Sequence, residues 1–199
     1  MVKAVDIEGL MKKYVEENSL ERADALYLLY TVGSDAAAKI LRARYGRSGA
    51  LSSVLDDLKA LGVDKVDPYG RSEDTGECLR DIIQDSFKQI CLDSVVESAK
   101  ARATALSLNA REILYLISIM RPETVDTSSL RKFYKLLFQK TLTDYEFERA
   151  LDELKGCYLI QYVSYGYLNF PPYFDDLLLE LRDVIPRVEV KVLWPEKEM

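Results

Sequence analysis

The sequence LDDLKALGVDKVDPYG at residues 55–70 has a partner, LDELKGCYLIQYVSYG, at residues 151–166. The first, second, fourth, fifth and last two residues are identical in the two stretches. The third residue is acidic in both (Asp57 and Glu153), and the ninth is aliphatic (Val63 and Leu159). This pattern is typical of the end of a helix, a tight turn, a strand and a second turn that contains glycine. We therefore expect the chain to contain two copies of one structural unit.

The first unit is predicted from hydrophobic spacing and from glycine and serine residues between the apolar runs. Gly62 follows the last helix as its C-cap, because glycine adopts a positive φ at low cost. The expected elements are a lead-in helix at 4–17, helices at 20–32, 36–45 and 50–61, a turn at 46–49, and a wing strand at 63–66.

The second unit repeats this order. Leu114-Tyr115-Leu116 aligns with Leu26-Tyr27-Leu28 of the first unit, but at a shorter offset than the 55–70 stretch, so about eight extra residues are expected near 122–129. Asn109 with Glu112, and Thr143 with Glu146, have the spacing of capping boxes. The expected elements are helices from 109, at 129–139 and from 143, a hairpin of 158–163 with 167–170, a helix at 173–184 and a terminal strand at 188–192.

Between the units, apolar residues recur every three or four positions from 77 to 106, which predicts one long helix. Such a helix can connect two domains or pair with its copy in a homodimer. The predicted organisation is an N-terminal domain at 1–76, a connecting helix at 77–106 and a C-terminal domain at 107–199.

The order helix, helix, turn, helix, strand, turn resembles the winged helix-turn-helix superfamily, in two tandem copies covering about 20–71 and 109–171. The resemblance implies a mainly α fold with small β-hairpin wings, an α+β class. Residues 47–58 resemble the turn and recognition helix of winged transcription regulators. In such proteins the third helix enters the major groove of DNA and the wing contacts the backbone.

The resemblance makes the first unit the candidate DNA-binding face. Basic residues lie near its turn, and small hydroxyl side chains lie on its third helix. The residues expected to contact DNA are Lys39, Arg42, Arg44, Arg47, Ser48, Ser52, Ser53, Lys59 and Arg71. The third helix of the second unit is instead rich in carboxylates, which phosphates repel, so that unit is expected to pack on protein.

Composition limits the other functions. The chain has 199 residues, a net charge of −6 and no histidine, which removes the commonest catalytic base and histidine-ligated metals. No phosphate-binding glycine motif is present, and the three cysteines are too far apart for a zinc or disulfide pattern. We expect a cytoplasmic, non-enzymatic protein with no cofactor, no metal and no membrane span. Few Asn and Gln residues fit a heat-adapted source.

Two functions remain from different classes. The leading prediction is a DNA-binding transcription regulator that uses the first unit. The alternative is a tandem winged-helix scaffold subunit that binds a protein partner through the acidic second unit and contacts no DNA. The 13 tyrosines favour the alternative, since tyrosine gives a large contact area at low entropic cost.

Overall fold

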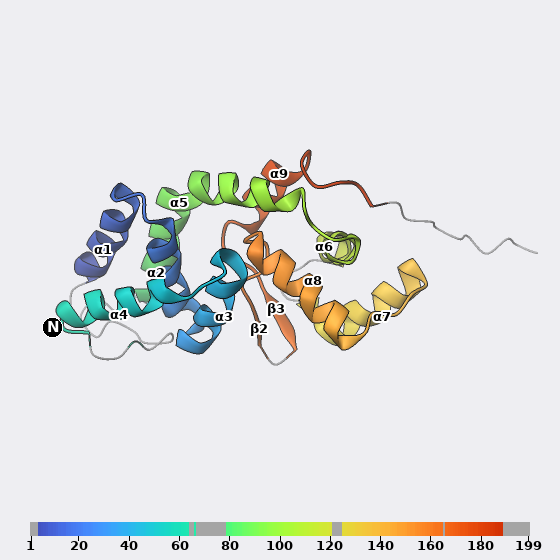
Figure 1. Ribbon diagram of the computed structural model, residues 1–199, viewed down its shortest axis with the longest axis horizontal. Coiled ribbons are helices and arrows are strands. Elements are labelled where there is room, and N and C mark those ends of the chain that lie inside the picture. The colour runs from blue at the N-terminus through green and yellow to red at the C-terminus, as the bar shows by residue number, and fades with distance from the viewer. Residues whose placement is uncertain (1–3, 64–65, 67–78, 121–124, 165, 189–199) are drawn as a thin grey trace, which may run out of the picture.

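The computed structural model describes residues 4–63, 66, 79–120, 125–164 and 166–188. The fold is mainly helical with one small antiparallel sheet (Figure 1), as predicted. The first half contains α1 (Ala4–Glu16), α2 (Leu20–Val32), α3 (Ser34–Tyr45), α4 (Gly49–Ala60) and α5 (Leu79–Ala103). The second half contains α6 (Leu108–Met120), β1 (Val125–Asp126), α7 (Thr127–Phe138), α8 (Asp144–Gly156), β2 (Tyr162–Ser164), β3 (Tyr167–Asn169) and α9 (Phe174–Leu181).

The helices of the first unit form where the hydrophobic spacing predicts them. Apolar side chains cover most of α2, and its residues from Ala23 to Thr31 are all buried. Gly46 ends α3 with a left-handed φ of 74°, and its N–H donates to the carbonyl of Arg42 at 2.9 Å. This conformation reverses the chain into α4, because glycine has no Cβ to oppose it.

The two copies of the repeat end their third helix with the same backbone turn. Gly62 has a φ of 88°, and Tyr158, at the equivalent position, has a φ of 62°. In both copies two N–H groups close the helix in a Schellman motif. These bonds run from Gly62 to Lys59 at 3.0 Å, from Val63 to Leu58 at 2.9 Å, from Tyr158 to Lys155 at 3.0 Å and from Leu159 to Leu154 at 3.0 Å.

The second unit carries a three-stranded sheet in the order β1-β3-β2. The hairpin is confirmed but shorter than predicted, with Val163 opposite Leu168. The sequence did not predict β1, which pairs Val125 with Leu168 from the other side and lies within the expected insertion. The Thr143–Glu146 capping box is confirmed, with the Thr143 side chain accepting the Glu146 N–H at 3.2 Å.

Several predicted details are wrong or lie outside the described residues. The N-terminal cap of α6 is Ser107, whose hydroxyl accepts the Ala110 N–H at 3.3 Å, and not Asn109. The helix predicted at 173–184 is confirmed only over Phe174–Leu181. Val63 and Val66 are not in a strand, while 64–65 lie outside the described residues. The terminal strand predicted at 188–192 falls almost wholly outside them, and Val188 is not in a strand.

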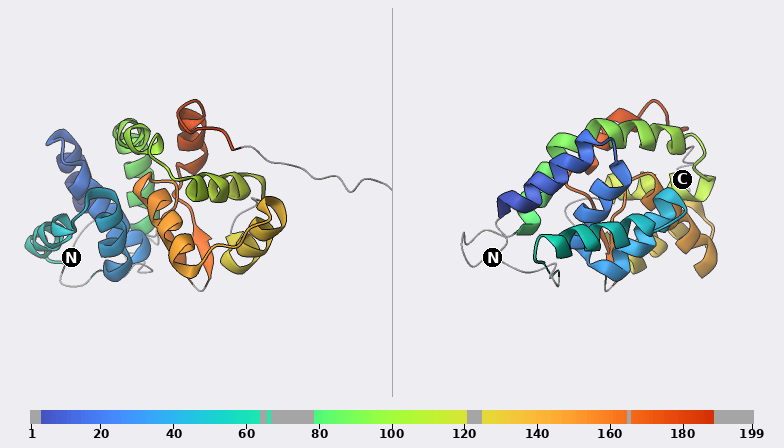
Figure 2. Two further views of the ribbon diagram at one scale, coloured as in Figure 1. Left: turned by 45° about the vertical axis from the view of Figure 1, so that its right-hand side comes forward. Right: turned by 60° about the vertical axis from the view of Figure 1, so that its left-hand side comes forward.

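Helix α5 is confirmed as the long helix, but it packs along the N-terminal helices. It lies against α1, α2 and α9 (Figure 2). The Phe87 ring stacks on Tyr27 with 4.4 Å between centroids and 9° between planes. Among the residues of α5 whose side chains are described, those that are buried include Ile83, Phe87, Val95, Val96, Ala99 and Ala103. Among the described side chains, most of the apolar stripe that suggested a homodimer is therefore covered within the same chain.

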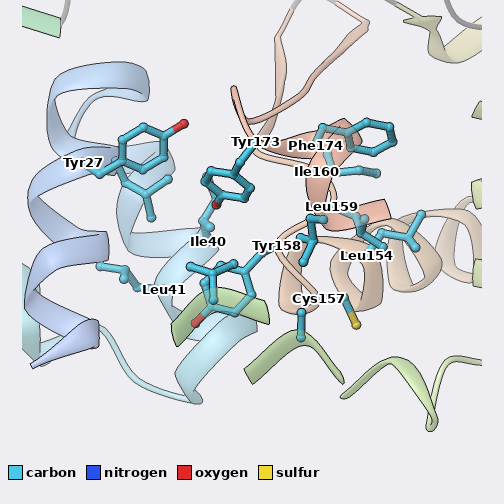
Figure 3. Close-up of a cluster of buried hydrophobic side chains, with 14 of the residues drawn as sticks. Tyr27, Ile40, Leu41, Leu154, Cys157, Tyr158, Leu159, Ile160, Tyr173 and Phe174 are labelled. Atoms are coloured by element: carbon cyan, nitrogen blue, oxygen red, sulfur yellow. The ribbon is translucent and has the colours of Figure 1, made fainter. Parts of the chain in front are cut away.

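One buried cluster runs through both halves of the chain. Figure 3 shows Ile40 and Leu41 from α3 beside Leu154, Tyr158 and Leu159 from the end of α8 and the turn after it. Helix α3 packs against α8, so the second helix of the first unit meets the third helix of the second unit. The two halves of the chain consequently share one hydrophobic core.

Candidate functional site

A groove of about 1170 Å³ lies where α3, the end of α5 and α8 meet. We call it the α3–α8 groove. We refer to the α3 residues as one wall, to the α8 residues as the other, and to the small residues Ala43, Ala101, Ala105 and Gly156 as the floor. Its residues are Ala36, Lys39, Ile40, Arg42, Ala43, Ala101, Arg102, Ala105, Leu106, Tyr145, Glu148, Arg149, Asp152, Glu153, Lys155, Gly156 and Cys157.

The floor of the groove is fixed by a close approach of the two walls. A Cβ built on Gly156 would lie 3.2 Å from the Ala43 carbonyl oxygen and 3.6 Å from the Arg102 guanidinium. Arg102 also donates from Nη1 to the Ala43 carbonyl at 3.2 Å. A larger residue at 156 would require the Ala43 carbonyl to shift by a few tenths of an ångström, so glycine lets α8 and α3 approach closely here.

A buried polar network joins the two copies below the groove. The Arg44 side chain is fully buried, and Nη1 forms an ion pair with Asp24 Oδ1 at 2.5 Å. Arg44 Nε donates to the Lys155 carbonyl at 3.0 Å, and the guanidinium carbon lies 4.2 Å from the Tyr158 ring centroid. Tyr45 donates to Asp24 at 3.2 Å and accepts from the Tyr158 hydroxyl at 2.7 Å. Arg44 therefore connects α2 and α3 to the end of α8.

Burial and charge act in opposite directions on this network. Burial lowers the pKa of the Arg44 guanidinium, but the combined effect of Asp24 and the surrounding tyrosines exceeds that of burial, so the pKa is raised. Burial also raises the pKa of the Asp24 carboxyl, against the effect of Arg44. Burial, together with the Asp24 charge, raises the pKa of Tyr45 far above its usual value. The Tyr45 hydroxyl consequently stays protonated and keeps its role as a donor.

The residues predicted to contact DNA do not form one surface. Lys39 and Arg42 are exposed and line the α3–α8 groove. The prediction for Arg44 is wrong, because its side chain is fully buried in the network with Asp24. Arg47 is exposed, and Nη2 pairs with Glu21 Oε2 at 2.9 Å. The hydrogen bond to Glu21 raises the pKa of Arg47.

The remaining predicted residues lie on or beside α4. Ser52 and Lys59 are exposed on it, together with Asp56, while Ser48 and Ser53 are half-buried. Arg71 lies outside the described residues. The exposed face of α4 thus carries one cation and one carboxylate.

The acidic helix of the second unit, α8, packs against α3 of the same chain. Its outward side chains line the groove. Tyr145 is 75% exposed, and Glu148 follows it by three residues on the same wall. Arg149 pairs with Glu153 at 3.5 Å, and Lys155 pairs with Asp152 at 2.8 Å.

Sequence reasoning missed the groove as a site. Its residues come from three distant segments of the chain, and no local motif marks them. A weaker signal was available on α8, where Tyr145, Glu148 and Asp152 follow one another by three and four residues, which places them on one outward face.

The described residues contain no group of three or more His, Cys, Asp or Glu side chains arranged to hold a metal ion. Among the same residues, no helix is long and apolar enough to cross a membrane.

Comparisons of the chain with protein-family models, with curated proteins and with solved structures found no match.

Proposed function

We propose that this protein is a non-enzymatic, tandem winged-helix subunit that binds another protein. The order α6-β1-α7-α8-β2-β3 with sheet order β1-β3-β2 supports a winged helix in the second half. The order α2-α3-α4 and the shared turn at Gly62 and Tyr158 support a second copy in the first half. A fold of this kind does not specify a function, so the surfaces must be considered.

The observation that carries the proposal is the environment of α8. In a winged helix that reads DNA, the third helix must reach the major groove with neutral or basic side chains. Helix α8 instead packs against α3, and carboxylates dominate its exposed side chains. The exposed acidic residues are Asp144, Glu146, Glu148 and Asp152. Phosphates would be repelled from this surface, whereas a protein segment can complement it.

The first unit offers a poor DNA-binding face for a different reason. The burial of Arg44 removes one of the predicted phosphate contacts, and Arg47 already has a carboxylate partner in Glu21. Lys39 and Arg42 lie in a groove whose opposite wall carries Glu148. A duplex following Lys39 and Arg42 would bring its phosphates toward that carboxylate.

DNA binding is the second candidate function, and one observation favours it. Within the described part of the chain, Lys39 and Arg42 have no ion-pair partner. Two unpaired cations three residues apart on one helix can contact adjacent phosphates. If they do so, affinity for DNA will fall steeply as salt rises.

Site-specific photo-crosslinking in the source cells tests the leading proposal. A photoreactive phenylalanine analogue would replace Tyr145 in the groove or, as a matched control, the exposed Tyr167 of β3. We expect discrete protein adducts from position 145 and none from position 167. Adducts to nucleic acid, or equal protein adducts from both positions, would contradict the proposal.

A further inference from the structure

The α3–α8 groove is a cationic site in an acidic chain. Five cations line it, namely Lys39, Arg42, Arg102, Arg149 and Lys155, against the three carboxylates of Glu148, Asp152 and Glu153. These give the groove a charge of +2, while the whole chain has a charge of −6. The groove therefore has a net charge opposite in sign to that of the whole protein, and negatively charged ligands are favoured there.

The excess positive charge lies on one side of the groove. On the α8 wall, Arg149 and Lys155 are already paired with neighbouring carboxylates. Lys39 and Arg42 on α3 have no ion pair among the described residues, and Arg102 donates to the Ala43 carbonyl without an ion pair among the same residues. The opposite wall presents Glu148 beside the exposed ring of Tyr145. A ligand must then be negative along one flank and neutral or positive along the other.

The small residues on the floor of the groove indicate a segment of protein as the ligand. The floor residues Ala43, Ala101, Ala105 and Gly156 have either a methyl side chain or none. A floor of this kind lets a helix approach closely, in the manner of amphipathic helices that lie in grooves between other helices.

We propose that the α3–α8 groove binds an acidic amphipathic helix of a partner protein. Its carboxylates lie against Lys39, Arg42 and Arg102, its small apolar face lies on the floor, and Tyr145 packs over it. This inference rests on the proposed function and adds the chemical class of the partner. A nucleic acid does not satisfy both walls, because its phosphates would also meet Glu148 and Asp152.

The test uses a synthetic helical peptide of about 14 residues, roughly four turns, with Leu and Ala on one face and Glu along one flank. A second peptide has Lys in place of Glu, and a duplex DNA oligonucleotide serves as the third probe. Binding to the full-length protein is measured by titration calorimetry. Amide chemical shifts then locate the peptide, and we expect the largest changes at Ala43, Ala105 and Gly156.

Two pairs of variants separate the groove from general charge effects. The double substitution Lys39→Glu/Arg42→Glu should lower the affinity for the Glu peptide by about ten-fold or more. Lys132→Glu/Lys135→Glu changes the net charge equally on exposed positions of α7 and should leave its affinity unchanged within about two-fold. Ala101→Trp should block the groove, whereas Ala60→Trp at an exposed end of α4 should not.

The outcomes distinguish this inference from the proposed function. Preferred binding of the Lys peptide, shifts outside the groove, or no binding of the Glu peptide at millimolar concentration would overturn the inference alone. Binding of the duplex that is lost in Lys39→Glu/Arg42→Glu would overturn the proposed function as well. Preferred binding of the Glu peptide, together with loss of that binding in Lys39→Glu/Arg42→Glu and in Ala101→Trp, would support the inference and the proposed function.

Discussion

The guanidinium of Arg44 lies 4.2 Å from the centre of the Tyr158 ring, and both side chains are buried. Arg44 lies on α3 and Tyr158 in the turn that follows α8. Tyr158 occupies the position that Gly62 occupies in the first copy, at a similar positive φ. A side chain in that conformation is strained, and here its ring covers a buried cation. The repeat thus diverges at the position where its two copies meet.

Removal of the charge on Asp24 should be severely destabilising. Asp24→Asn leaves the Arg44 guanidinium buried without its counter-ion, which costs about 3–5 kcal/mol in comparable buried pairs. Urea unfolding followed by circular dichroism measures the loss. Arg47→Ala breaks an exposed pair with Glu21 and should leave the unfolding midpoint nearly unchanged. Equal effects of the two substitutions would show that the buried network is not a principal connection.

Two glycines with free space around them should respond in opposite directions to alanine. A Cβ at either Gly9 or Gly46 would meet nothing within 4 Å, but only Gly46 has a positive φ, of 74°. Gly9→Ala should stabilise the protein by about 0.5–1 kcal/mol, because Gly9 lies inside α1. Gly46→Ala should destabilise it by about 1 kcal/mol or more. If both substitutions changed the free energy of unfolding in the same direction, the left-handed conformation of Gly46 between α3 and α4 would be contradicted.

Stability should fall in alkaline solution. Burial raises the pKa of Cys157 to about 11, and those of Tyr30 and Tyr158 to about 12. In the unfolded chain these groups ionise near pH 9.0 for cysteine and 10.0 for tyrosine. Below those pH values both states are protonated, and the contribution of these groups to the stability of the folded state is fully present. The stability is lost as the pH rises from the unfolded to the folded pKa values, because only the unfolded chain then releases protons.

The measurement is the free energy of unfolding in urea between pH 8 and pH 12. For Tyr158 alone the expected loss is about 2 kcal/mol. Tyr158→Phe and Tyr30→Phe should each flatten the dependence on pH. A constant free energy across this range would show that these side chains are not buried as described.

Much of the fold was predictable because its signals are local. The apolar spacing of α2, the Thr143–Glu146 capping box and the hairpin around Gly166 each depend on a few neighbouring residues. Strand β1 has only two residues and is defined by its pairing with β3, so its own sequence contains no pattern that predicts a strand. The cap at Ser107 was missed because Asn109 offers the same chemistry two residues later.

The candidate site was less predictable, since it depends on contacts between distant segments. Arg44 follows the buried Ile40 by four residues, so helical spacing did place it on the inner face. Its charge suggested the surface instead, and only the opposing Asp24 explains its burial. To predict the groove, one would need to know that α3 packs against α8, and no pattern in the sequence indicates that contact.

The measurement that tests the central claim most directly is a titration of the full-length protein against fluorescein-labelled random duplex DNA at low and moderate salt. Lys39→Glu/Arg42→Glu is measured beside the wild type, and Arg44 is left intact because it belongs to the core. If the protein acts through protein contacts, the anisotropy of the duplex will not rise even at low salt. A rise that weakens steeply with salt and disappears in the variant would place Lys39 and Arg42 on phosphates and contradict the account.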